Sequence, residues 1–226
     1  MKKLNYGLLP LAAVFIILSI SALFWQGCSC SGDKNSDIAE ITSIEGEAKV
    51  NGQPAQKNQK LKADDIIEVD KNSVAKIKYV EEGYQFTLYS ADNKSAAKLQ
   101  IKSPSDDGKS FITNLIEGLI TFFVPPKDQR SKLLKIQTDV AVVSIHQTKG
   151  KVLSTKEKYT AALAEGKIGV NISGTDYQIG AGQQINFDKI KKEKPAVSDY
   201  DFMSETEKKL YYRAGDQKTS SGTDGY

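Results

Sequence analysis

Cysteine and histidine are almost absent from this chain. Its 226 residues include two cysteines, Cys28 and Cys30, and one histidine, His146. Because both cysteines stand near the N-terminus, the rest of the chain has no disulfide framework, and cysteine pairing does not indicate a redox compartment. A single histidine with no cysteine nearby does not make a typical zinc site, which takes four nitrogen or sulfur ligands. We therefore predict that the protein carries no metal and no other cofactor.

The chain also lacks an excess of charge of either sign. It has 31 lysine and arginine residues against 28 aspartate and glutamate residues, which gives a formal net charge of +3. The lysines are spread among comparable numbers of acids, as on an ordinary solvated surface. Neither a basic footprint for nucleic acid nor an acidic tail is present. We expect no nucleic-acid partner.

The N-terminus combines positive charge, an apolar run and a cysteine. Lys2 and Lys3 precede an uncharged, mostly apolar stretch over residues 7–25, and Gly27 stands directly before Cys28. This order is typical of a bacterial lipoprotein export signal. The interpretation assigns Gly27 to recognition by signal peptidase and the Cys28 thiol to a diacylglyceryl anchor that palmitate labelling would detect.

The signal departs from the usual lipobox, because Trp25 stands where an aliphatic residue is common and Gln26 is larger than usual. It resembles the relaxed lipoboxes of spirochaetes. The alternative is an uncleaved anchor helix, since residues 8–25 number 18 and about 20 apolar residues span a bilayer. Lysines before the apolar run favour the cytoplasmic side. Both interpretations therefore place the folded part in the cell envelope, outside the cytoplasm.

The residues after Cys28, which direct lipoproteins to the inner or the outer membrane, do not decide which membrane holds the protein. Ser29, Cys30 and Ser31 form no clear acidic retention signal. We expect anchoring to the inner membrane with the folded part in the periplasm, and the outer membrane is the alternative.

Short runs of alternating apolar and polar residues recur after Ile38, rich in β-branched and aromatic side chains. Such runs predict half-buried antiparallel strands. Residues 111–124 are predicted to form two strands around Glu117-Gly118, and the continuous apolar run 140–145 a fully buried strand. We expect an all-β fold, an antiparallel β-sandwich or β-roll of many short strands with an internal pseudo-repeat. The other predicted strands cover residues 44–50, 66–69, 74–80, 84–89, 97–101, 134–138, 159–164, 167–172 and 184–187.

One short helix is predicted near the C-terminus. Ser204-Glu205-Thr206-Glu207 matches a capping box, and Leu210, Tyr211 and Tyr212 follow it. These aromatic residues either dock on the sheet or contact a partner. The predicted organisation is residues 1–27, signal peptide or anchor helix; 28–37, lipidated cysteine and flexible tether; 38–190, β domain; 191–213, extension with the short helix; and 214–226, disordered tail.

Glu-Gly pairs mark the internal repeat. Residues 45–51 are similar to residues 165–171, and residues 63–70 are similar to residues 181–188 in the same order. A partial third copy begins at Glu117-Gly118. Each copy predicts a turn glycine, a strand, a second turn and another strand.

In this order the motifs resemble the FecR domain family of cell-envelope sensor proteins. The resemblance covers roughly residues 38–190 and is carried by the order of weak motifs. Asp64 stands where the family usually has glycine, and His146-Gln147-Thr148 replaces its usual Arg-Gly-Thr. The matching segments are Glu45-Gly46-Glu47-Ala48-Lys49-Val50, Leu61-Lys62-Ala63-Asp64-Asp65-Ile66, Ser73 to Leu88, Glu117-Gly118, Ile136-Gln137-Thr138, Glu165-Gly166-Lys167-Ile168-Gly169-Val170 and Ala181-Gly182-Gln183.

The resemblance implies a periplasmic domain that senses or scaffolds through contacts with an envelope protein. The family's archetype has a long cytoplasmic segment that contacts a sigma factor. Only six residues precede the apolar run here, so we do not expect sigma-factor regulation. Two alternatives stay open: a carbohydrate- or peptidoglycan-binding module, and a single-pass membrane signalling protein with an uncleaved helix.

No residue pattern predicts catalysis, and we expect no enzyme activity. His146 follows an apolar strand and is interpreted as a turn residue, because a nucleophile needs a base and an orienting group. The pairs Asp64-Asp65 and Asp106-Asp107 are interpreted as turn caps, with calcium binding as the alternative. The aromatic residues that could form a binding face are predicted to fill the core instead: Tyr84, Phe86, Tyr89, Phe122 and Phe123.

Overall fold

The structure is a computed structural model that describes residues 36–90, 95–125 and 132–200. The chain divides into Met1–Asp33 and a second unit, Lys34–Tyr226. The described residues all belong to the second unit. The predictions for Gly27, Cys28, the C-terminal helix and the polar tail lie outside the described residues.

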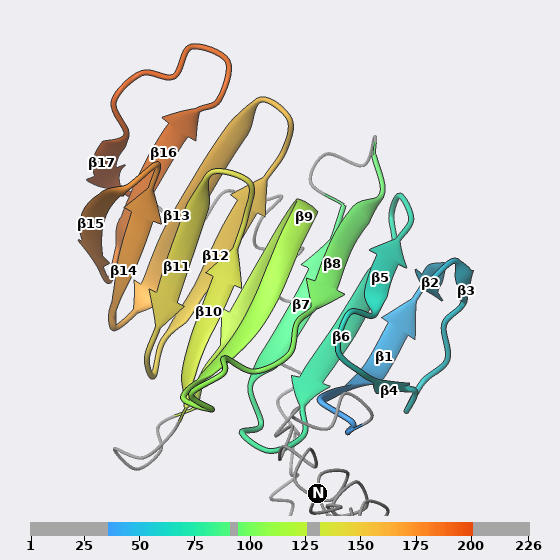
Figure 1. Ribbon diagram of the computed structural model, residues 1–226. Coiled ribbons are helices and arrows are strands. Elements are labelled where there is room, and N and C mark those ends of the chain that lie inside the picture. The colour runs from blue at the N-terminus through green and yellow to red at the C-terminus, as the bar shows by residue number, and fades with distance from the viewer. Residues whose placement is uncertain (1–35, 91–94, 126–131, 201–226) are drawn as a thin grey trace, which may run out of the picture. The chain divides into compact units, whose positions relative to one another are not determined.

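The described residues contain strands and no helix, as the all-β prediction requires, and the strands form two sheets that pack face to face (Figure 1). Among these residues no helix is long and apolar enough to cross a membrane. Sheet A has the spatial order β4 (Lys60–Leu61), β1 (Ala39–Glu45), β6 (Val74–Tyr79), β7 (Gln85–Tyr89), the second half of β9 (Ser110–Phe123), β12 (Lys149–Ser154), β13 (Lys158–Glu165), β16 (Gln183–Asp188) and β17 (Ala196–Asp199).

Sheet B is built in the same way from the remaining strands. Its spatial order is β3 (Gln53–Pro54), β2 (Ala48–Val50), β5 (Ile66–Val69), β8 (Ala97–Ile101), the first half of β9, β10 (Leu133–Gln137), β11 (Ala141–Ile145), β14 (Lys167–Ile172) and β15 (Thr175–Gly180).

Strand β9 belongs to both sheets. Its first half pairs with β8 and β10 in sheet B, and its second half pairs with β7 and β12 in sheet A. The change of sheet falls at Glu117-Gly118, so the two predicted strands are one continuous strand that crosses between layers. The pairing of β9 with β10 is parallel, which differs from the purely antiparallel sheet that alternation predicted.

The repeated Glu-Gly pairs are the corners at which the chain changes sheets. Gly46 joins β1 to β2, Gly118 lies at the crossing within β9, and Gly166 joins β13 to β14. Their φ angles are +82°, +120° and +85°, a region that glycine enters without steric cost. A Cβ atom at Gly46 would lie 2.2 Å from Ser73 Oγ, and one at Gly166 would lie 2.5 Å from Thr148 Cγ2. The prediction of one strand over 44–50 is wrong, because the corner divides it.

The second block of the repeat is not equivalent in the two copies. In the first copy β5 pairs with β2 in sheet B. In the second copy β16 pairs with β13 in sheet A. The two copies of the pseudo-repeat therefore have the same structure at the glycine corners. Beyond the corners they are similar in sequence but occupy different places in the fold.

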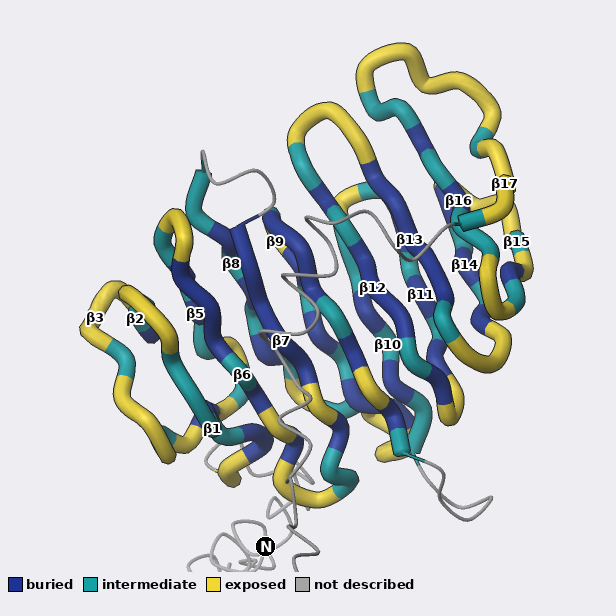
Figure 2. Tube along the Cα trace, turned by 180° about the vertical axis from the view of Figure 1, so that it is seen from behind, coloured by how far each residue is buried: buried dark blue, intermediate teal, exposed yellow. Residues whose placement is uncertain are grey.

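The core lies between the sheets and is filled by alternate side chains of both. Figure 2 colours each position of the chain by its burial. Tyr79, Tyr84, Phe86 and Phe111 form an aromatic group in it, with 5.0 Å between the ring centres of Tyr79 and Phe111. Offset and edge-on ring contacts of this kind add to the stabilisation from burial.

The run 140–145 is not fully buried, contrary to the prediction. In β11, Ala141, Val143 and Ile145 face the core, whereas Val142 and Ser144 are half-buried. The side chains of a strand alternate between its two faces, and the outer face of sheet B is partly solvated. A continuous apolar run was therefore an unreliable sign of burial on both faces.

Candidate interaction surface

His146 lies at the crossing from β11 to β12 and is exposed, in agreement with its interpretation as a turn residue. The next residue, Gln147, has a φ of +40° and stands where the FecR-like pattern has glycine. The left-handed backbone is thus present although the glycine is not. In the part of the chain that the structure describes, no group of three or more His, Cys, Asp or Glu residues could hold a metal ion.

Both aspartate pairs contribute a turn cap. Asp65 Oδ2 accepts a hydrogen bond from the Lys62 backbone N–H at 2.8 Å. Asp107 Oδ1 accepts from Ser105 Oγ at 2.6 Å and from the Lys109 N–H at 3.0 Å. The bond from Ser105 is the main cause that lowers the pKa of the Asp107 carboxyl. The turn-cap interpretation is confirmed for these two residues.

The aromatic residues divide between the core and the outer face of sheet A. Tyr84, Phe86 and Phe122 are buried in the core, as predicted. Phe123 is 40 % exposed, so the prediction that it fills the core is wrong. Tyr89 is buried but lies in a separate small apolar cluster outside the core, which the sequence did not predict.

The two ends of the sandwich differ in how their edge strands are protected. At the N-terminal end, β3 and β4 are two residues long each, and Pro54 in β3 has no N–H to offer. At the C-terminal end, β15 has six residues and β17 has four, and they lie together in Figure 1. Short edges and proline discourage strand addition, whereas a longer open edge permits it.

The C-terminal edge is also exposed in its side chains. All four residues of β17 are exposed, including Val197 at 44 %. In β15, Thr175, Asp176 and Gln178 are exposed. Among the described residues each of these strands pairs on one side only, β15 with β14 and β17 with β16. This edge can accept an added strand.

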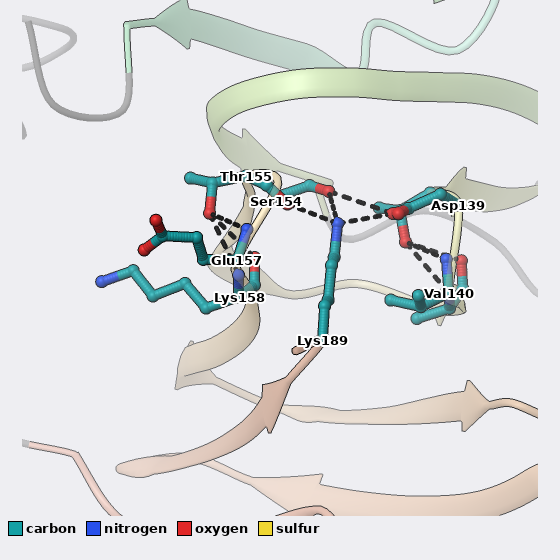
Figure 3. Close-up of polar contacts among 9 residues, drawn as sticks. Asp139, Val140, Ser154, Thr155, Glu157, Lys158 and Lys189 are labelled. Carbon is teal, nitrogen blue, oxygen red and sulfur yellow. Dashed lines mark hydrogen bonds and ion pairs between the residues drawn. The ribbon is translucent and has the colours of Figure 1, made fainter. Parts of the chain in front are cut away.

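Lys189 fixes the connection from β16 to β17 (Figure 3). Its Nζ donates to Asp139 Oδ1 at 2.6 Å, to Ser154 Oγ at 3.0 Å and to the Thr155 carbonyl at 2.6 Å. The side chain is only 8 % exposed, and a buried ammonium group is tolerated because such partners replace water. The contacts tie the start of the β16–β17 connection to two turns, the one before β11 and the one after β12.

The neighbouring serine and lysine are not arranged for nucleophilic catalysis. A catalytic lysine must have a free lone pair to take the serine proton. Here the Lys189 ammonium donates to Ser154 and to two further oxygens, and Ser154 is completely buried. The geometry is that of a structural clamp, and its members were not predicted from the sequence.

No family model matches the chain, and no curated protein matches it either. Two crystal structures of a "putative anti-sigma factor" from Parabacteroides distasonis share its fold, each with 16 % sequence identity and a TM-score of 0.51. Each likeness covers 60 % of this chain and 60 % of the other, so the chain spans three fifths of the length of these neighbours. At this level of identity the likeness establishes the fold alone.

Proposed function

We propose that this protein is a non-enzymatic bacterial lipoprotein of the cell envelope, with a FecR-like domain that acts as a periplasmic sensor or scaffold. In this proposal residues 1–27 are removed and Cys28 carries the lipid, on the inner membrane or alternatively on the outer membrane. The β domain binds another envelope protein through its C-terminal edge. The regulatory name of the structural neighbours supports this direction.

The observation that carries the proposal is the difference between the two ends of the sandwich. One end closes with two-residue strands, and the other presents β15 and β17 as exposed edges. Strand addition obtains its affinity from backbone hydrogen bonds and its specificity from alternate side chains. A partner strand on β15 would lie beside Tyr177, which is half-buried, and the exposed Gln178.

Photo-crosslinking in intact cells tests the proposal. A photoreactive residue replaces Gln178 in β15, and a matched variant replaces Gln53 in β3, since both glutamines are exposed on edge strands at opposite ends. We expect position 178 to yield one reproducible envelope protein and position 53 to yield none. Equal products from both positions, or none from position 178, would contradict the proposal.

A further inference from the structure

The outer face of sheet A is the surface that points away from sheet B. Its members follow from alternation, because Ile77, Leu88, Ile120 and Val152 of the same strands face the core. Strand pairing places the outer residues in rows across β6, β7, β9 and β12. One row is Val74, Tyr89, Leu119 and Leu153, and the next row is Lys76, Thr87, Thr121 and Lys151.

The first of these rows is buried although no described strand lies over it (Figure 2). Val74 is 5 % exposed, Tyr89 1 % and Leu119 8 %, and they form an apolar cluster of their own with Leu153. Burial raises the pKa of the Tyr89 hydroxyl to about 12, against weaker lowering by hydrogen bonds with Thr121 and Thr87 and a further small rise from Glu45. A large side chain on an uncovered sheet face does not lose this much solvent contact.

The outer face of sheet B provides the comparison. On this face, the outward-facing residues of the neighbouring strands β9, β10 and β11 include Ile112, Lys135 and Val142. All three are half-buried. The two outer faces belong to sheets of similar construction. The row on sheet A is therefore more buried than the outward positions on sheet B, although no described strand lies over it.

Tyr200, the last described residue, shows the direction in which the chain leaves β17. Its backbone N–H donates to the Gly182 carbonyl at 2.7 Å, which continues the pairing beyond β17. Lys151 Nζ lies 4.3 Å from the centre of the Tyr200 ring, a cation–π contact. Lys151 belongs to the outer face of sheet A and is 7 % exposed. The chain thus leaves β17 directly onto this face.

We propose that residues 201–213 lie across the outer face of sheet A and cover the row of Val74, Tyr89 and Leu119. From β12 the strand β7 is two strand spacings away, about 10 Å. An extended chain advances about 3.3 Å per residue, so a few residues beyond Tyr200 reach the row.

The composition of the segment matches the face that it would cover. Apolar atoms for the row come from Phe202, Met203, Leu210, Tyr211 and Tyr212. Asp201, Glu205 and Glu207 supply negative charge. The outer face presents lysines at positions 76, 78, 149 and 151, which are potential partners for these acids. Because the segment also contains Lys208, Lys209 and Arg213, it has no net charge, and the match to the face rests on its apolar residues.

Hydroxyl-radical footprinting of the full chain and two truncations tests the cover. A chain that ends at Asp201 lacks all five apolar residues of the segment, and a chain that ends at Arg213 keeps them. We expect labelling of Tyr89 to rise several-fold in the first truncation and to stay unchanged in the second. Tyr159, which is buried in the core, reports on folding and should stay protected in all three chains. Unchanged protection of Tyr89 in the chain ending at Asp201 would overturn the proposal.

A crosslink in the full chain decides the matter if the shorter truncation unfolds. A photoreactive residue replaces Thr121, which is half-buried in the middle of the outer face. Trypsin cleaves after Lys192 and Lys208 but not after Lys194, which precedes Pro195. The expected product therefore joins this position to the peptide 193–208 or to the peptide 210–213. A product that joins residues 1–35 or a second copy of the chain would contradict the assignment to the C-terminal segment.

Discussion

Replacing the corner glycine Gly166 by alanine should destabilise the fold more than any replacement at an open glycine with the same backbone. Gly166 has a φ of +85°, and its Cβ would lie 2.5 Å from Thr148 Cγ2. The left-handed backbone costs a residue with a side chain about 1–2 kcal/mol, and overpacking adds about 1–3 kcal/mol. We expect Gly166→Ala to lower the free energy of unfolding by about 2–5 kcal/mol.

Two control glycines separate these contributions. Gly182 has a φ of +73° with nothing within 4 Å of the added Cβ, so Gly182→Ala should cost only the backbone strain of about 1–2 kcal/mol. Gly169 in β14 has an ordinary φ and open space, so Gly169→Ala should be neutral or stabilise by up to about 1 kcal/mol. Urea denaturation of the three variants measures the series. A cost at Gly166 no larger than at Gly182 would refute the close packing of the corner.

Three further predictions concern buried polar groups. Tyr79→Phe should lower the free energy of unfolding by about 1–3 kcal/mol, because the Tyr79 hydroxyl bonds with that of the buried Thr113. Tyr159→Phe should be neutral or stabilising, since the Tyr159 hydroxyl has no hydrogen-bond partner in the described structure. Urea denaturation measures both variants. A larger loss of stability in Tyr159→Phe than in Tyr79→Phe would contradict the hydrogen bonding assigned to the two hydroxyls. Burial raises the pKa of Tyr79, Tyr89 and Tyr159, so the stability from each is complete below pH about 10, the unfolded value, and is lost as the pH rises through the folded value. The Tm should therefore fall as the pH rises above about 10. In Tyr159→Phe the Tm should fall less steeply with pH. An equal dependence of Tm on pH in that variant would contradict the burial of the Tyr159 hydroxyl. Lys189→Met removes three hydrogen bonds to the turns beside it and should cost about 1–3 kcal/mol; an unchanged Tm would show that the clamp does not stabilise the fold.

Local alternation predicted most of the strands, because each half-buried strand shows its own period of two. Strands β5, β6, β8, β13 and β14 lie close to their predicted bounds. Strand β12 was missed because it begins Lys149-Gly150-Lys151, and β15 because Thr175-Asp176 opens a mostly polar strand. Pattern alone does not distinguish such strands from loops.

The arrangement of the strands depends on contacts that local sequence does not encode. The Glu-Gly corners were visible as a repeat, but the change of sheet at Gly118 follows from pairing with strands on both sides of β9. The Lys189 clamp joins residues 50 and 35 positions apart in the chain. The turn caps of Asp65 and Asp107 were predictable because their partners are two or three residues away.

Metabolic labelling with a palmitate analogue tests most directly that a lipid on Cys28 holds the folded unit in the cell envelope. The wild-type chain is compared with Cys28→Ala, and Cys30→Ala is the matched control two residues away. We predict label in the wild type and in Cys30→Ala and none in Cys28→Ala. Absence of label from the wild type, with residues 1–27 retained in the mature protein, would contradict the lipoprotein assignment. The protein would then be a single-pass membrane protein.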